Sequence, residues 1–268
     1  MTESQSTSRS VLTFLLICYG FTWVVWLPGV LSSYGILPNL PWPPFFGIGT
    51  FGPMVSAVWI LKKEGGWAKV KEWLNTGFRK KVGWRWWVIL ITVSLLTPPL
   101  GLWLFSLTGG EIAEISFFRT PWMIIPTFLL MLVMGGGNEE FGWRGFLLPR
   151  LLERFTPLQA DLILIPLHAF WHIPLFFNAS TIQYTYPFWL FTIFGIGFTP
   201  LINRIYRNTS GSILAAIFFH AFVNTSLDLF PPVGPWVGDS PIPLVIIGVL
   251  FLFFAIIISL STKEFKTR

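Results

Sequence analysis

The 268-residue chain carries too little charge for a water-soluble globular protein. Hydrophobic residues make up 53% of it and charged residues 11%, whereas a typical soluble domain carries about 25% charged residues. Together with a mean hydropathy of +0.67, this composition excludes a sizeable soluble domain. We therefore predict a single all-α polytopic membrane domain that spans residues 1–268.

Apolar runs long enough to cross a bilayer follow one another along the chain, each close to the roughly 20 residues that a spanning helix needs. They cover about 10–31, 44–61, 84–107, 121–138, 158–177, 185–203, 210–230 and 241–261, which predicts about eight transmembrane helices. The first run lacks the cleavage pattern of a signal peptide, so we interpret it as an uncleaved span. The single cysteine, Cys18, lies within it and predicts neither a disulfide framework nor a cysteine metal site.

Basic residues gather on one side of the predicted membrane. One set lies between the second and third runs: Lys62, Lys63, Lys69, Lys71, Arg79, Lys80, Lys81 and Arg85. With the N-terminus inside, the other loops on that side add Arg144, Arg150, Arg154, Arg204, Arg207, Lys263, Lys266 and Arg268. The opposite loops hold mainly the acids Glu111, Glu114, Asp228 and Asp239, and Arg119 is the only basic residue among them. Because cytoplasmic loops carry the excess of Lys and Arg, we predict cytoplasmic N- and C-termini.

The basic segment at about 62–83 also contains an amphipathic pattern. Trp67, Val70, Trp73 and Leu74 share one helical face, which predicts a short interfacial helix on the cytoplasmic leaflet. The net charge of +6 indicates contact with anionic membrane lipids and not with nucleic acid. The compact chain and its short loops favour a prokaryotic plasma membrane.

Two adjacent acids, Glu139 and Glu140, end the fourth apolar run. An ionisable group in the bilayer centre costs about 2.5–3.5 kcal/mol, so such groups are functional candidates. Glu140 and Arg144 are four residues apart and can pair along one helical face. Glu139 points about 100° away from Glu140 and has no basic residue three or four positions further on. We therefore assign Glu140 and Arg144 a structural, orienting role and Glu139 a catalytic one as general base.

The three histidines of the chain lie within two other apolar runs. His168 and His172 are four residues apart on the fifth run, and His220 and Asn224 repeat this spacing on the seventh. A carboxylate with imidazoles can activate water directly or bind a metal, and His or Asn can donate to an oxyanion. The sequence thus leaves two forms of hydrolysis open. One uses Zn²⁺ or another divalent metal on Glu139, His168, His172 and His220; the other is metal-independent.

These residues fall into three ordered motifs. Together the motifs resemble the CAAX prenyl endopeptidase and bacteriocin-processing family, the intramembrane proteases also called the abortive-infection family. The family's Glu-Glu-x-x-x-Arg motif is similar to Glu139 through Arg144, and its His-x-x-x-Asn motif to His220 through Asn224. Its Phe-x-x-x-His motif is similar to the segment that ends at His172, but His168 stands where phenylalanine is usual. The resemblance covers roughly residues 125–230, within a motif-bearing core of about 121–230.

The resemblance implies an intramembrane endopeptidase. It implies that Glu139 and His172 activate water, and that His220 and Asn224 polarise the scissile carbonyl or stabilise the oxyanion. The implied substrate is a peptide or a lipidated protein C-terminus, such as a prenylated Cys-a-a-X tail, cut near the cytoplasmic face. Members of the family are described both as metalloproteases and as glutamate-type proteases.

Two other functions use the same residues. A proton- or ion-coupled membrane carrier could relay protons through intramembrane acids and imidazoles, although such carriers typically contain inverted repeats, and we detect none in the sequence. A non-catalytic membrane protein of the bacteriocin-immunity type could keep the motifs for stability. We carry both as alternatives to the endopeptidase.

Residue counting places the candidate groups at different depths. Glu139 falls near the cytoplasmic end of the fourth run, while His220 lies about ten residues, or roughly 15 Å, into the seventh. For the groups to meet, the fourth helix must continue inward or the fifth must start deep, near Pro166. We expect Glu139 within ~10 Å of His172 or His220, in a polar cleft open to the cytoplasm.

Overall fold

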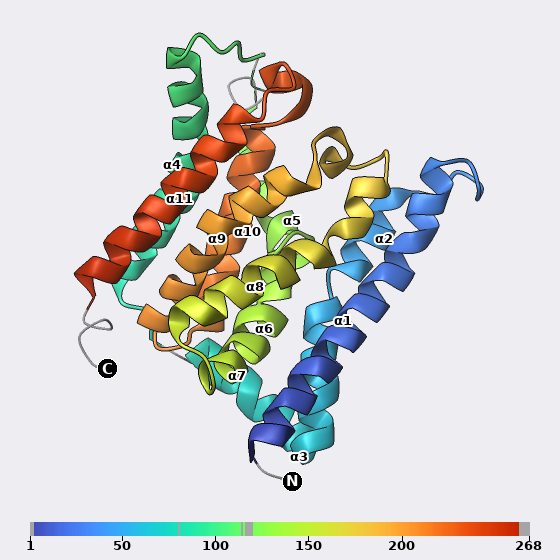
Figure 1. Cartoon of the computed structure of the whole chain (residues 1–268), viewed down its shortest axis with the longest axis vertical. Coiled ribbons are helices and arrows are strands. Elements are labelled where there is room, and N and C mark those ends of the chain that lie inside the picture. The colour runs from blue at the N-terminus through green and yellow to red at the C-terminus, as the bar shows by residue number, and fades with distance from the viewer. Residues whose placement is uncertain (1–2, 80, 114, 116–119, 263–268) are drawn as a thin grey trace.

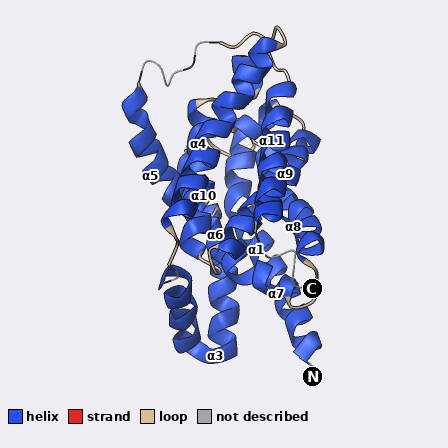
Figure 2. Ribbon diagram, turned by 90° about the vertical axis from the view of Figure 1, so that its left-hand side faces the viewer, coloured by secondary structure: helices blue, strands red, loops and turns tan. Residues whose placement is uncertain are grey.

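The computed structural model describes residues 3–79, 81–113, 115 and 120–262, and within them it consists of helices and loops, with no β-strand (Figure 2). The α-helices are α1 Glu3–Ser33, α2 Trp42–Gly49, α3 Gly52–Arg79, α4 Trp84–Leu107, α5 Ile124–Met134, α6 Glu140–Gly142, α7 Leu148–Leu152, α8 Pro157–Trp171, α9 Phe188–Asn208, α10 Ile213–Leu229 and α11 Ile242–Ser261. Short 3-10 helices lie at Pro121–Met123, Gly137–Glu139, Ile173–Phe177, Ile182–Thr185 and Gly234–Val237, and a π-helix at Trp143–Leu147.

The described helices confirm an all-α polytopic membrane protein. Seven segments are long and apolar enough to span a bilayer: Ser8–Ser33, Trp42–Phe78, Trp84–Leu107, Pro121–Leu152, Pro157–Phe177, Phe188–Asn208 and Ile242–Ser261. The predicted seventh run corresponds to α10, which is apolar but has only 17 residues. Large apolar side chains such as Leu260, Trp84 and Val24 are more than two-thirds exposed, as expected where the surrounding solvent is lipid.

The helices pack around two hydrophobic clusters. One cluster joins α9, α10 and α11 to α4, and the other joins α1 and α3 to α8 and to the segment of the glutamate motif. Gly197 of α9 and Gly248 of α11 meet so closely that a Cβ on Gly197 would lie 1.9 Å from the Gly248 carbonyl oxygen. Lipid tails are as apolar as these side chains, so close packing through small residues holds such helices together.

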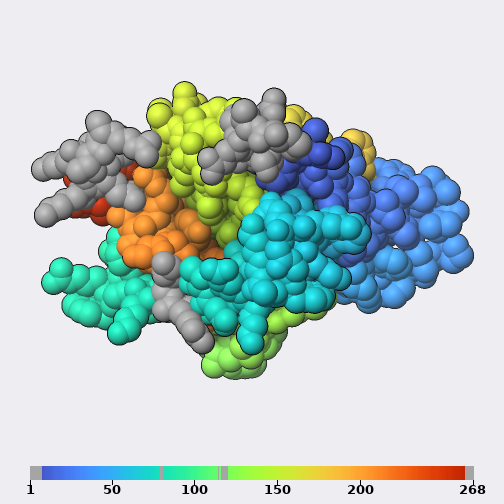
Figure 3. All heavy atoms as spheres, turned by 90° about the horizontal axis from the view of Figure 1, so that it is seen from below, coloured from blue at the N-terminus to red at the C-terminus, as the bar shows by residue number. Residues whose placement is uncertain are grey.

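The predicted interfacial helix is the second half of α3. The backbone leaves helical geometry at Gly65 and Gly66, where φ is +69° at Gly66. Beyond this bend Val70 is buried and Trp73 and Leu74 are partly buried; Trp67 is 63% exposed. Figure 3, which views the molecule from below, shows this segment in the middle of that face. The apolar face of the second half of α3 therefore packs against the rest of the protein.

The start of α1, the end of α11 and the second half of α3 lie at one end of the molecule (Figure 1). The loops between α8 and α9 and between α10 and α11 lie at the other end. Six of the residues used to predict orientation lie outside the described residues: Lys80, Glu114, Arg119, Lys263, Lys266 and Arg268.

Candidate active site

Glu139 lies in the interior of a broken helical span and not at its end. The fourth span runs from Pro121 to Leu152, so the predicted boundary at 138 was wrong. The prediction ended the span there because glycines and charges interrupt the apolar run, but α5 is followed directly by the short helical pieces that continue it. The predicted inward continuation of the fourth helix is thus present, and Glu139 is 4% exposed.

The break in this span depends on Gly136. Its φ is +111°, a backbone conformation that L residues rarely adopt. A Cβ at this position would lie 2.6 Å from the His220 imidazole and 2.8 Å from the Asn224 amide nitrogen. Glycine therefore allows the backbone before Glu139 to approach α10 closely. The amide of Asn224 uses this proximity and donates to the Gly135 carbonyl oxygen over 2.5 Å.

His168 of α8 and His172, the residue that follows this helix, lie beside Glu139. The start of α8 is fixed by a capping box, in which the Thr156 hydroxyl accepts from the Gln159 backbone N–H. At the other end of the helix, His168 and His172 are four positions apart and face one side. His168 Nε2 lies 3.2 Å from Glu139 Oε2. His172 is half-buried, and its Nδ1 donates to the His168 carbonyl oxygen over 2.9 Å. Because a carbonyl can only accept, Nε2 of a neutral His172 carries the free lone pair.

One ligand atom from each of Glu139, His168 and His172 lies within 4.8 Å of the others. The predicted convergence, with Glu139 within ~10 Å of a motif histidine, is therefore confirmed. His168 also has aromatic neighbours, since its ring centroid is 5.3 Å from Trp143 and 6.3 Å from Phe198. It thus fills an aromatic environment and contacts the carboxylate at the same time.

His220 and Asn224 of α10 lie with Glu140 in a layer beside the cluster of Glu139, His168 and His172. Arg144 donates from Nη1 to Glu140 Oε1 over 2.8 Å, so the pair expected from the four-residue spacing is present. His220 Nδ1 lies 2.7 Å from the same oxygen. His220 thus contacts Glu140. It was predicted as a further possible metal ligand, but it does not join the cluster of Glu139, His168 and His172.

A chain of buried polar groups extends from Arg144 and was not foreseen from the sequence. Arg144 Nε donates to Asn203 Oδ1 over 3.0 Å, and Asn203 Nδ2 donates to Asp161 Oδ1 over 2.8 Å. Arg204 Nη1 closes the chain on Asp161 Oδ2, also over 2.8 Å. Asp161 is the one acid in the apolar run 158–177, which was the available signal. Its partner could not be inferred, because Arg204 was counted as a loop charge.

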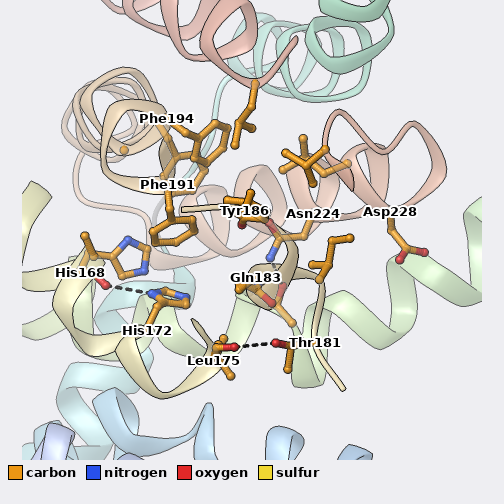
Figure 4. A pocket seen from close by; sticks show the side chains of 18 of the residues that line it. His168, His172, Leu175, Thr181, Gln183, Tyr186, Phe191, Phe194, Asn224 and Asp228 are labelled. Carbon is orange, nitrogen blue, oxygen red and sulfur yellow. Dashed lines mark hydrogen bonds between the residues drawn. The ribbon is translucent and has the colours of Figure 1, made fainter. Parts of the chain in front are cut away.

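The four predicted catalytic residues, Glu139, His172, His220 and Asn224, line one cavity of about 440 Å³ together with His168, which was predicted as a possible metal ligand. Figure 4 shows His168 and His172 on one side of it, beside aromatic side chains of α9. Most of the wall is apolar, with Trp26, Trp42 and Phe46 among the aromatic residues. Burial raises the pKa of the Tyr186 hydroxyl, so this part of the wall is a neutral hydrogen-bond donor.

The cavity reaches the end of the molecule opposite to the termini, whereas both were predicted to face the cytoplasm. Its outer wall includes residues 181–183, 231–233 and Trp236, in the loops at the end opposite to α1's start and the second half of α3 (Figure 1). The side chains of Trp143 and Arg144 are buried, and Arg144 contacts Glu140. A cleft open to the cytoplasm and cytoplasmic termini were both predicted, and this geometry allows only one of them.

Comparison with known proteins gives two matches. Residues 121–226 match the family model described as type II CAAX prenyl endopeptidase Rce1-like. The chain is also 24% identical, over 267 residues and 94% of each chain, to a protein of Methanococcus maripaludis named CAAX prenyl protease 2. The predicted resemblance to the CAAX prenyl endopeptidase family is confirmed. The matched segment begins at the 3-10 helix before α5 and ends within α10, so it contains all three motifs.

Proposed function

We propose that this protein is an intramembrane endopeptidase of the CAAX prenyl endopeptidase type. One observation supports the proposal most strongly: the carboxylate, the imidazoles and the carboxamide of three separate motifs line the same cavity. Hydrolysis of a peptide bond needs a base for the water and donors for the oxyanion, and these side-chain types supply both.

In the proposed reaction, Glu139 and His172 hold and deprotonate a water molecule, which attacks the scissile carbonyl carbon. Glu139 takes the water proton and later delivers it to the leaving amine. The developing oxyanion accepts hydrogen bonds from Asn224 and His220. His220 Nδ1 lies 2.7 Å from Glu140 Oε1, so Nε2 is the ring nitrogen that remains to face the oxyanion.

The chemistry of the cavity wall favours a substrate with a large apolar part. Aromatic and aliphatic residues form most of the wall, and the relative in Methanococcus maripaludis is named a CAAX prenyl protease. We propose that the substrate is a peptide or a lipidated protein C-terminus that enters from the membrane of a prokaryotic cell, with anionic lipids around the basic end of the protein.

Reconstituted wild-type protein tests the function directly. In vesicles, we expect it to release fluorescence from a quenched peptide that carries a farnesylated or apolar tail, while empty vesicles show none. Proton-coupled flux without any cleavage would instead identify a carrier. Neither cleavage nor flux across a panel of lipidated and plain peptides would leave a non-catalytic immunity-type protein and reject the endopeptidase.

The cluster of Glu139, His168 and His172 fits a divalent metal. It offers one carboxylate and two imidazoles within 4.8 Å of one another, which is the ligand set of zinc hydrolases that keep a fourth position open. The Nδ1–H of His172 also donates a hydrogen bond to the His168 carbonyl oxygen, as the second ring nitrogen of a metal-bound histidine usually does. These three residues would hold the metal, which would supply Lewis-acid polarisation of water when bound.

Metal analysis separates the two forms of the reaction. We expect about one equivalent of Zn²⁺ or another divalent metal in wild-type protein purified without chelators, and a loss of at least tenfold in its affinity in the His168→Phe variant. His172→Phe, at the residue that follows the end of α8, is the matched comparison. Metal-free wild-type protein whose cleavage is unaffected by chelators would instead indicate a metal-independent, glutamate-type reaction.

Cysteine labelling determines which side the cavity faces. Native Cys18 is fully buried, so introduced cysteines can be read against a low background. If the termini are cytoplasmic, a membrane-impermeant maleimide should label Tyr184→Cys at the cavity end in intact cells, and exposed Glu72→Cys only after permeabilisation. The reverse pattern would place the termini outside and the active site towards the cytoplasm.

A further inference from the structure

One acidic side chain of the cavity has no role in the proposed reaction. Asp228 lines the cavity together with His220 and Asn224, and it remains exposed, which places it at the rim. The three residues follow one another at intervals of four on α10 and so share one side of that helix. Figure 4 shows Asp228 across the cavity from His168 and His172.

The position of Asp228 is electrostatically unfavourable for the protein alone. It lies in the last turn of α10, where the partial charge of the helix end is negative and a basic residue would be favoured. That turn contains no basic residue. In the described part of the chain, Asp228 forms no ion pair and no hydrogen bond with another side chain or the backbone. The described contacts therefore give this carboxylate no stabilising role in the fold.

No described lysine or arginine lies beside Asp228 to compensate its charge. Among the described residues that line the cavity none is lysine or arginine, and Glu139 is the other acid. The described residues of the four loops at this end, 34–41, 108–113 with 115 and 120, 178–187 and 230–241, also contain no lysine or arginine, but include Glu111 and Asp239. A cavity mouth of one sign concentrates ligands of the opposite sign.

We propose that Asp228 is a specificity-determining residue that binds a cationic side chain of the substrate. The inference rests on the proposed peptidase activity and names the substrate feature that the site selects. From His220 to Asp228 the helix rises about 12 Å, at 1.5 Å per residue. An extended peptide covers this distance in three or four residues, at about 3.3 Å each. The preferred lysine or arginine therefore lies three or four residues from the scissile bond.

A positional scan tests this assignment. Peptides that differ only in one residue, lysine or glutamate, at each of the five positions on either side of the cleaved bond are compared by their kcat/KM. We expect wild-type protein to prefer lysine about three- to tenfold at the third or fourth position on one side, mainly through KM. Asp228→Asn should abolish this preference and keep the rate on neutral peptides. The preference should also weaken at high salt.

Asp239→Asn is the matched control. Asp239 is an exposed acid in the neighbouring loop and does not line the cavity, and its φ of 56° is a conformation that asparagine accepts. It should leave the lysine preference unchanged. Equal loss of the preference in both variants would show a general surface effect and reject Asp228 as the binding residue, as would a preference that survives in Asp228→Asn.

A binding measurement separates this inference from the catalytic proposal. The same fluorescent peptides are titrated onto Glu139→Gln protein, with and without Asp228→Asn. Tighter binding of the lysine peptide that depends on Asp228 supports the inference even if no peptide is cleaved by wild-type protein. Equal affinity for lysine and glutamate peptides at every position would overturn it while leaving the peptidase proposal standing.

Discussion

Replacing Glu139 by glutamine is expected to lower the rate of peptide hydrolysis by about 10²- to 10⁴-fold, the usual contribution of a general base. Glutamine has nearly the same shape, and its amide can still meet His168, whose Nε2 lies 3.2 Å from Glu139 Oε2. It cannot accept a proton from water. The loss should therefore appear in kcat, measured with the quenched peptide in vesicles, while peptide binding persists.

The control for this variant is Glu72→Gln, at an exposed position in the second half of α3. It also removes one carboxylate, yet it should change neither kcat nor KM noticeably. Thermal unfolding in detergent verifies that both variants remain folded. A Glu139→Gln protein that cleaves within threefold of the wild-type rate would remove Glu139 from the reaction and with it the proposed mechanism.

Removing the charge of Arg144 is expected to produce the largest loss of stability. The guanidinium is 1% exposed and contacts Glu140 and Asn203, and Glu140 is fully buried. In Arg144→Met, the carboxylate would stay buried with His220 as its remaining partner. Breaking a buried ion pair in this way costs about 3–5 kcal/mol, which should be measurable as a lower free energy of unfolding in a denaturing detergent.

Two comparisons give this measurement its meaning. Lys69→Met breaks an exposed pair, in which Lys69 Nζ lies 2.6 Å from Glu64 and the lysine side chain is 43% exposed, and should cost about 0–1 kcal/mol. The double variant Glu140→Gln/Arg144→Met removes both charges and should recover part of the loss. A cost for Arg144→Met no larger than that for Lys69→Met would show that this network does not stabilise the fold.

Local spacing predicted the parts of the site that depend on one helix. The pairing of Glu140 with Arg144 followed from four residues along one turn, and the common orientation of His168 and His172 followed from the same rule. These predictions were confirmed because helical geometry fixes such neighbours wherever the helix lies. The sequence likewise predicted that Glu139 would point away from the pair, towards other groups.

Predictions that depended on depth were less successful. The fourth span was ended too early because Gly135 to Gly137 and two acids looked like the end of an apolar run. In the structure, the unusual φ of Gly136 lets the chain break and continue. The hydrogen bond from Asn203 to Asp161 links α9 to α8, and no spacing within either helix predicts it. The direction of the cavity depends in the same way on how separate helices pack.

Composition and helical periodicity alone determined that this chain is an all-α membrane protein with acids, imidazoles and a carboxamide at membrane depth, because hydrophobicity and the 3.6-residue turn act locally. Tertiary structure decided that Glu139 meets His168 and His172, that His220 contacts Glu140, and that Asp228 has no hydrogen-bond or ion-pair partner among the described residues. Such pairings join residues up to 80 positions apart. They arise from close packing between helices, which no local pattern encodes.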